Sequence, residues 1–110
     1  MARLLLFDPD ERHAKTVVSA LESQSHKLTV CASRRETLGH IKTKLAKFKV
    51  IILDFSNRPD DWEFLDRVCR LTITCVPKPG LLCLARTNWG PHVRLQVERK
   101  GAKILYEQSA

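Results

Sequence analysis

The sequence is poor in glycine, and none of its four glycines belongs to a phosphate-binding motif. Neither G-x-G-x-x-G nor G-x-x-x-x-G-K-[ST] occurs, and the first apolar run ends in Asp8-Pro9-Asp10, where a nucleotide-binding α/β domain would carry its glycine-rich loop. The G-x-S-x-G motif of a serine nucleophile is absent as well. These absences exclude dinucleotide-binding, P-loop and α/β-hydrolase chemistry.

Long hydrophobic runs are also missing. The longest apolar runs have about five residues, whereas a membrane-spanning helix needs about 20. Met1-Ala2-Arg3 and the four apolar residues after it are too short for a signal peptide. The sequence therefore predicts a cytoplasmic protein without a membrane segment.

Cysteine and histidine follow no ligand spacing. There is no C-x-x-C pair, and three of the four cysteines fall within predicted strands or helices, which favours core thiols over a disulfide framework or a zinc site. The histidines are scattered along the sequence. The cysteines and histidines concerned are Cys31, Cys69, Cys75, Cys83, His13, His26, His40 and His92. A metal site built from soft ligands is disfavoured by this distribution.

The composition is that of an ordinary folded domain, with 44% apolar and 28% charged residues in 110. This length predicts one domain over residues 1–110. The net charge of +7 favours a polyanionic partner or an acidic protein surface. A small basic nucleic-acid-binding protein is the last-ranked alternative, because helix-turn-helix spacing and interleaved stacking aromatics are both missing.

Apolar runs and amphipathic segments alternate along the chain. Helix starts are expected at Asp10, at Ser33 with Glu36, at Asp60 with Glu63 and at Pro91. Strands are expected at residues 4–7, 28–32, 50–53, 81–85 and 103–106. This alternation predicts an α/β fold with a doubly wound, five-stranded parallel sheet of flavodoxin-like order 2-1-3-4-5, without a fifth helix.

Polar residues follow three of these strands. Asp8 and Asp10 follow the first strand, Asp54 ends the third, and Arg86-Thr87 follows the fourth. Because ligands of open α/β sheets bind beyond the carboxyl ends of the strands, these residues are expected to converge. Clustered carboxylates repel one another, and Mg²⁺ would relieve the repulsion and allow one aspartate to form an acyl phosphate. Alternatively, Arg86 neutralises the cluster as an internal cation.

Over its whole length the sequence resembles the receiver domains of two-component response regulators. The matching residues are Leu5-Leu6-Phe7-Asp8, Ile51-Ile52-Leu53-Asp54, Pro59, Asp61 and Gly101-Ala102. The resemblance implies a signalling module of a phosphorelay, not an enzyme. Asp54 would accept a phosphoryl group from a histidine kinase or phosphotransfer protein, Asp8, Asp10 and Asp54 would hold Mg²⁺, and Thr87 would supply the hydroxyl at the end of strand four.

The sequence also departs from the receiver pattern. Pro9 stands where a second adjacent acid is usual, which argues against Mg²⁺, and Thr87 fits only if the register of the fourth strand shifts. Tyr106-Glu107-Gln108 occupies the region of the lysine that closes the last strand. These departures favour an alternative hypothesis, a phosphorylation-independent pseudo-receiver that acts by protein–protein interaction.

A basic patch is expected between the fourth helix and the last strand, which is the usual partner-contact surface of receiver domains. We expect an acidic protein partner to bind there, with Trp89 either as an aromatic anchor or as a core residue. The predicted partner-binding residues are Trp89, Arg94, Arg99, Lys100, Lys103 and Tyr106.

Overall fold

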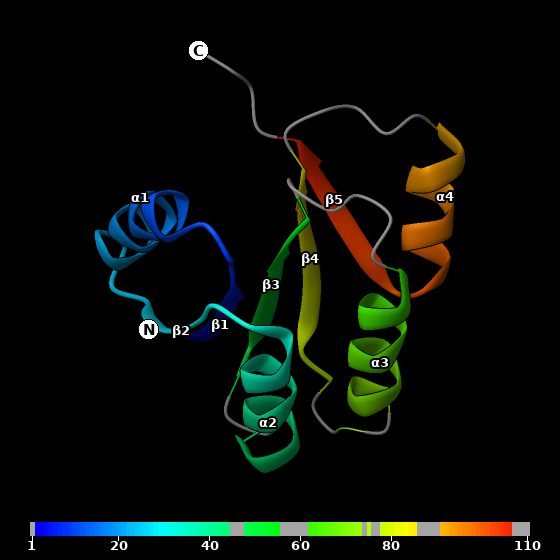
Figure 1. Ribbon diagram of the computed structural model, residues 1–110, viewed down its shortest axis with the longest axis horizontal. Coiled ribbons are helices and arrows are strands. Elements are labelled where there is room, and N and C mark those ends of the chain that lie inside the picture. The colour runs from blue at the N-terminus through cyan, green and yellow to red at the C-terminus, as the bar shows by residue number, and fades with distance from the viewer. Residues whose placement is uncertain are drawn as a thin grey trace.

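The computed structural model describes residues 2–44, 48–55, 62–73, 75, 78–85 and 91–106. Strands and helices alternate through these residues (Figure 1). The strands are β1 (Arg3–Phe7), β2 (Lys27–Cys31), β3 (Val50–Asp54), β4 (Gly80–Ala85) and β5 (Ala102–Tyr106). The helices are α1 (Glu11–Glu22), α2 (Arg34–Lys44), α3 (Trp62–Thr72) and α4 (Pro91–Arg99).

All five strands are parallel and lie in the order β2-β1-β3-β4-β5. In the middle of the sheet, Leu5 pairs with Thr29 on one side and with Ile51 on the other. The predicted fold class and strand order are therefore confirmed. The prediction that no fifth helix follows concerns residues 107–110, which lie outside the described residues.

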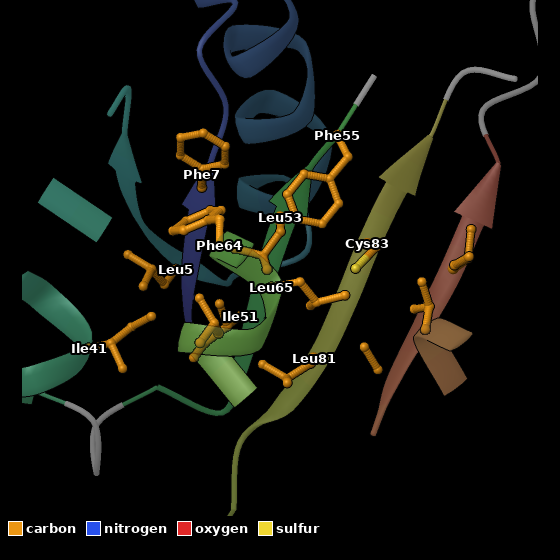
Figure 2. Packing of buried hydrophobic residues seen from close by; sticks show 14 of the residues in the cluster. Leu5, Phe7, Ile41, Ile51, Leu53, Phe55, Phe64, Leu65, Leu81 and Cys83 are labelled. Atoms are coloured by element: carbon orange, nitrogen blue, oxygen red, sulfur yellow. The ribbon is translucent and has the colours of Figure 1, made fainter. Parts of the chain in front are cut away.

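The helices cover the two faces of the sheet unequally. Figure 1 shows α2, α3 and α4 on one face and α1 on the other. Because successive strand residues point to opposite faces, the odd-numbered residues of β1 and β3 face the three helices. Among the described residues, seventeen buried ones form that larger core, part of which is drawn in Figure 2: Leu5, Phe7, Cys31, Ile41, Phe48, Ile51, Leu53, Phe55, Phe64, Leu65, Val68, Leu81, Cys83, Ala85, Val97, Ala102 and Ile104.

The face below α1 has a smaller core. Its buried residues are Leu4, Leu6, Ala14, Ile52 and Leu84. The predicted apolar stripe of α1, which includes Val17, Val18 and Leu21, packs against them without being fully buried. Asp8 and Asp54 continue the even-numbered register of β1 and β3, so both carboxylates lie on the α1 side at the ends of their strands.

Two predicted helix starts are confirmed in atomic detail. The Asp10 side chain accepts hydrogen bonds from the backbone N–H groups of Arg12 and His13, and the Ser33 hydroxyl accepts one from the N–H of Glu36. Asp60, where the third helix was expected to begin, lies outside the described residues. No helix in the described ranges is long and apolar enough to cross a membrane.

The cysteines form no disulfide. Cys31 and Cys83 are buried in the larger core, and Cys69 and Cys75 are partly buried. The prediction of core thiols is therefore confirmed for Cys31 and Cys83.

Candidate functional site: an acidic pocket bridged by His13

Two carboxylates meet at the carboxyl ends of β1 and β3. Asp8 directly follows β1 and Asp54 is the last residue of β3, and both are almost completely buried, at 1% and 5% exposure. The adjacent pairing of the two strands holds them side by side. The structure thus brings together the two residues that the sequence placed in one crevice.

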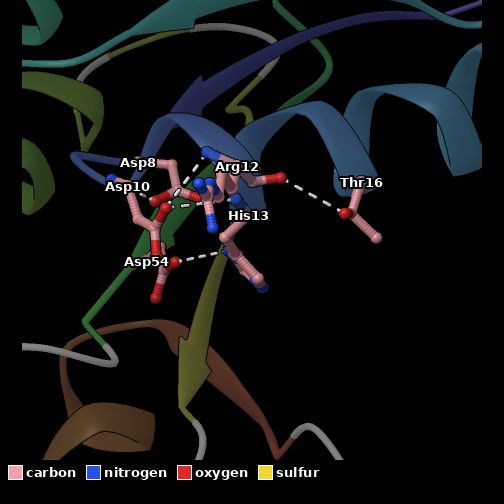
Figure 3. Close-up of polar contacts among 6 residues, drawn as sticks. All are labelled: Asp8, Asp10, Arg12, His13, Thr16 and Asp54. Atoms are coloured by element: carbon pink, nitrogen blue, oxygen red, sulfur yellow. Dashed lines mark hydrogen bonds and ion pairs between the residues drawn. The ribbon is translucent and has the colours of Figure 1, made fainter.

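The imidazole of His13, in the first turn of α1, lies between these carboxylates (Figure 3). Its Nδ1 is 2.5 Å from Oδ2 of Asp8 and 2.8 Å from Oδ2 of Asp54. Both neighbours of this nitrogen are carboxylate oxygens, so a proton on Nδ1 is donated to the pair. In its imidazolium form, the ring would bring a positive charge to a pocket that otherwise holds two acids.

Asp10 takes a different role from Asp8. Its Oδ1 is directed at the start of α1 and caps the N–H groups of Arg12 and His13 at 3.0 and 3.3 Å. Its own backbone N–H donates to Oδ1 of Asp8 at 2.9 Å. Asp10 therefore fixes the first turn of α1, which positions His13, and orients the Asp8 carboxylate.

Burial dominates the electrostatics of Asp8. Loss of solvent raises the pKa of its carboxyl group above the ordinary value of 3.8, and the hydrogen bonds from His13 and from the N–H of Asp10 oppose this rise. The charge of Asp54 acts in the same direction as burial. The pocket thus favours the protonated form of Asp8 more than water does.

His13 was not among the residues singled out as site candidates from the sequence. The spacing between Asp10 and His13 could have indicated this role. A residue three positions after the helix-capping Asp10 lies in the first turn of the helix, and a side chain there that faces the sheet points back toward the ends of the strands. The sequence did indicate an internal cation as an alternative to Mg²⁺, but assigned that role to Arg86. Arg86 and Thr87 lie outside the described residues.

Comparisons with known proteins bear on this arrangement. No protein-family model and no curated protein matches the sequence. Solved structures match over the full chain: a response regulator receiver domain from Clostridium thermocellum has a TM-score of 0.81 at 17% identity and is covered over 85% of its length. Chemotaxis protein CheY4 from Vibrio cholerae has a TM-score of 0.78 at 24% identity, with 89% of that chain covered.

The chain has the fold of a response-regulator receiver domain. The resemblance predicted from the sequence is thereby confirmed at the level of the fold. A third receiver-like match is a response regulator from Burkholderia pseudomallei, described with a phosphorylated aspartic acid, a calcium ion and citrate. It has a TM-score of 0.79 at 20% identity, and the match covers all of this chain and 62% of that one.

The described residues of this receiver-like pocket do not fit Mg²⁺. That ion prefers a nearly octahedral shell of oxygen atoms, whereas an imidazole nitrogen lies within hydrogen-bonding distance of both Asp8 and Asp54. Asp10 is engaged at the start of α1, and Pro9 offers no side-chain ligand. One ligand atom from each of Asp8, His13 and Asp54 lies within 4.8 Å of the other two, and this mixed nitrogen and oxygen donor set differs from a magnesium cage.

The basic residues predicted as a partner surface are distributed over two faces of the receiver-like fold. Arg94 and Arg99 are exposed on α4, where Arg94 pairs with Glu98 at 3.5 Å. Lys100 forms an ion pair with Asp66 of α3. Lys103 alternates in β5 with the buried Ala102 and Ile104, so it points to the opposite face of the sheet.

The other predicted partner residues are not described in full. Trp89 lies outside the described residues, and Tyr106 is placed at the end of β5 without a description of its side chain. Of the described residues of the predicted patch, Arg94 and Arg99 form the exposed surface of α4, whereas Lys100 pairs with Asp66 and Lys103 lies on the other face of the sheet.

Proposed function

We propose that this chain is a single receiver-like domain that works without phosphorylation, as a protein-interaction module. The observation that carries the proposal is the bridging position of His13, whose Nδ1 contacts both Asp8 and Asp54. A side chain of the protein itself thus stands between the two acids that would otherwise share a divalent cation.

Two features of the described residues argue against phosphoryl transfer to Asp54. The attacking carboxylate oxygen must reach a phosphodonor, but Asp54 is 5% exposed and its Oδ2 lies against His13. The charge of the transferred group must also be neutralised, usually by a metal ion. The donor set of the described pocket does not suit Mg²⁺, which supports a role that does not depend on phosphorylation.

An interaction module needs an exposed surface, and α4 offers one. Arg94 and Arg99 are exposed there, and Leu95 is an exposed apolar residue on the same helix, at 49% exposure. An acidic protein partner with an apolar contact residue would complement this surface.

The second candidate is a conventional receiver that is phosphorylated on Asp54 by a histidine kinase or phosphotransfer protein. The receiver-domain fold and the position of Asp54 at the end of β3 favour it. In this reading, the His13 side chain would have to leave the two carboxylates before Asp54 could react.

Incubation with acetyl phosphate and Mg²⁺, followed by intact-mass measurement, separates the two candidates. We expect no phosphoryl adduct, while a phosphorylatable receiver domain mixed into the same reaction gains the expected mass. A mass increase that Asp54→Asn abolishes would overturn the proposal and establish the conventional receiver.

A further inference from the structure

A second cluster of ligand-type side chains lies at the end of β2. It consists of the Cys31 thiol, the Glu36 carboxylate and the His40 imidazole, and one ligand atom from each lies within 4.8 Å of the other two. None of these three side chains takes part in the acidic pocket or in the α4 surface. The cluster is therefore independent of the proposed function.

The turn between β2 and α2 brings these residues together. Cys31 ends β2, and α2 begins at Arg34 after the capping Ser33, so the first turn of the helix lies next to the thiol. Glu36 and His40 are four residues apart on α2 and therefore share one face of that helix. Short connection and helical spacing together build a three-residue site from a ten-residue segment.

Thiolate, imidazole and carboxylate are the three side-chain ligands that zinc uses in proteins. With Zn–S near 2.3 Å and Zn–N or Zn–O near 2.1 Å, a tetrahedral ion spaces its ligand atoms roughly 3.3–3.6 Å apart. The three ligand atoms lie within 4.8 Å of one another, so they would have to approach one another by at most about 1.5 Å. We propose that Cys31, Glu36 and His40 bind a zinc-type divalent cation, with the fourth coordination position open to water.

The three ligands differ in exposure in a way that leaves an entry path. Cys31 is buried, His40 is partly buried and Glu36 is exposed, so a cation would approach the thiol past Glu36 and His40. Burial foremost, and then the charge of Glu36, raises the pKa of the Cys31 thiol to about 11. Binding therefore displaces the thiol proton to solvent as the metal–sulfur bond forms, and the cation offsets the carboxylate charge.

The thiol distinguishes this site from the acidic pocket. The two sites are close, because the backbone N–H of Asp8 donates to the carbonyl oxygen of Cys31 at 3.0 Å. The pocket of Asp8, His13 and Asp54 also offers metal-type ligands, but it contains no sulfur. A spectroscopic signal from a metal–thiolate bond therefore separates the Cys31 site from the acidic pocket, and variants of the other cysteines identify the thiol.

Cobalt(II) provides that signal. We expect reduced protein titrated with Co²⁺ to develop a thiolate-to-cobalt charge-transfer absorption at one equivalent, and Zn²⁺ to remove it by displacement. Cys31→Ser should abolish the band, and His40→Gln should weaken Zn²⁺ binding at least about 10-fold. The matched controls are Cys69→Ser and His92→Gln, which should leave the band and the Zn²⁺ affinity unchanged.

Three results of the titration would contradict the proposed zinc-type site. Absence of the band in the wild-type protein would overturn the proposal without any variant being needed. A band that survives Cys31→Ser, or that is lost with Cys69→Ser, would also overturn it. Because Cys31 is buried, circular dichroism must show that Cys31→Ser is folded, and the His40→Gln variant at a partly buried position gives an independent test.

Discussion

The two faces of the sheet differ both in packing and in chemistry. Among the described residues, seventeen buried apolar residues lie on the face below α2, α3 and α4, whereas five lie on the face below α1. In the same part of the chain, each face carries a cluster of ligand-type side chains at the carboxyl end of its strands. The α1 face holds Asp8, His13 and Asp54, and the α2 face holds the cluster that begins at Cys31.

The larger core therefore accounts for most of the stability, whereas the α1 face carries the acidic pocket. The larger core contributes most of the apolar burial, and it includes the edge-on ring contacts of Phe64 with Phe7 and Phe55. The α1 face contributes less to stability but orients the His13 side chain that bridges the pocket. A change in the first turn of α1 can therefore alter the pocket without disturbing the larger core.

The largest expected effect on the free energy of unfolding concerns the difference in size between the two cores. Leu65→Ala, at a fully buried position of α3, should lower the free energy of unfolding by about 2–5 kcal/mol. Val17→Ala, at a partly buried position of α1, should lower it by about 1 kcal/mol. Urea denaturation measures both values, and equal losses would contradict the unequal contribution of the two faces.

The next largest effect concerns His13, whose Nδ1 contacts both Asp8 and Asp54. His13→Ala leaves the buried Asp8 and Asp54 carboxylates facing each other without their shared donor, so the free energy of unfolding at pH 7 should fall by about 1–3 kcal/mol. His92→Ala, at an exposed position of α4, is the control and should change it by less than about 0.5 kcal/mol. The loss should shrink when His13→Ala is made in the Asp8→Asn background, and an undiminished loss would show that the two side chains are not coupled.

Substitution of Asp8 by asparagine should have a smaller effect on the free energy of unfolding, and this effect should be stabilising. Because its pKa is raised in the folded state, the folded protein binds more protons than the unfolded chain above pH 3.8, and stability falls as the pH rises through this window. Asp8→Asn removes that loss, so the variant should gain stability relative to the wild-type protein as the pH rises toward 7. Thermal unfolding from pH 4 to pH 7 measures the difference, which should vanish toward pH 4. A difference that grows as the pH falls would contradict the sign.

The smallest effect compares ion pairs on the two faces. Lys100 connects the end of α4 to Asp66 of α3 and is partly buried, so Lys100→Met should cost up to about 1 kcal/mol at low salt. Lys15 pairs with Glu11 within α1 at 3.6 Å, and both side chains are largely exposed, so Lys15→Met should have almost no effect. Unfolding at low and high ionic strength checks both variants, and a larger loss for Lys15→Met would be inconsistent with the geometry.

The fold could be predicted from the sequence because local patterns agreed with one another. The apolar runs, the capping residues Asp10 and Ser33 and the turn at Gly101 each indicated an element, and their alternation indicated a parallel sheet. The meeting of Asp8 and Asp54 followed from the same argument, because neighbouring parallel strands end at the same edge.

The histidines could not be placed in this way. Whether His13 reaches two carboxylates depends on how α1 docks on the sheet, which no local pattern encodes. His40 was judged to follow no ligand spacing, although it lies four residues after Glu36 on one helix. The sequence pattern did not indicate that the turn after Cys31 brings its thiol close to Glu36 and His40.

The central claim, that His13 takes the place of a divalent cation between Asp8 and Asp54, is tested most directly by an Mg²⁺ titration followed by amide NMR shifts. We predict no saturable shifts at Asp8, Asp54 and their neighbours in the wild-type protein. His13→Ala removes the imidazole from between the two carboxylates and should produce saturable shifts there. Saturable shifts of the Asp8 and Asp54 amides in the wild-type protein would contradict the claim.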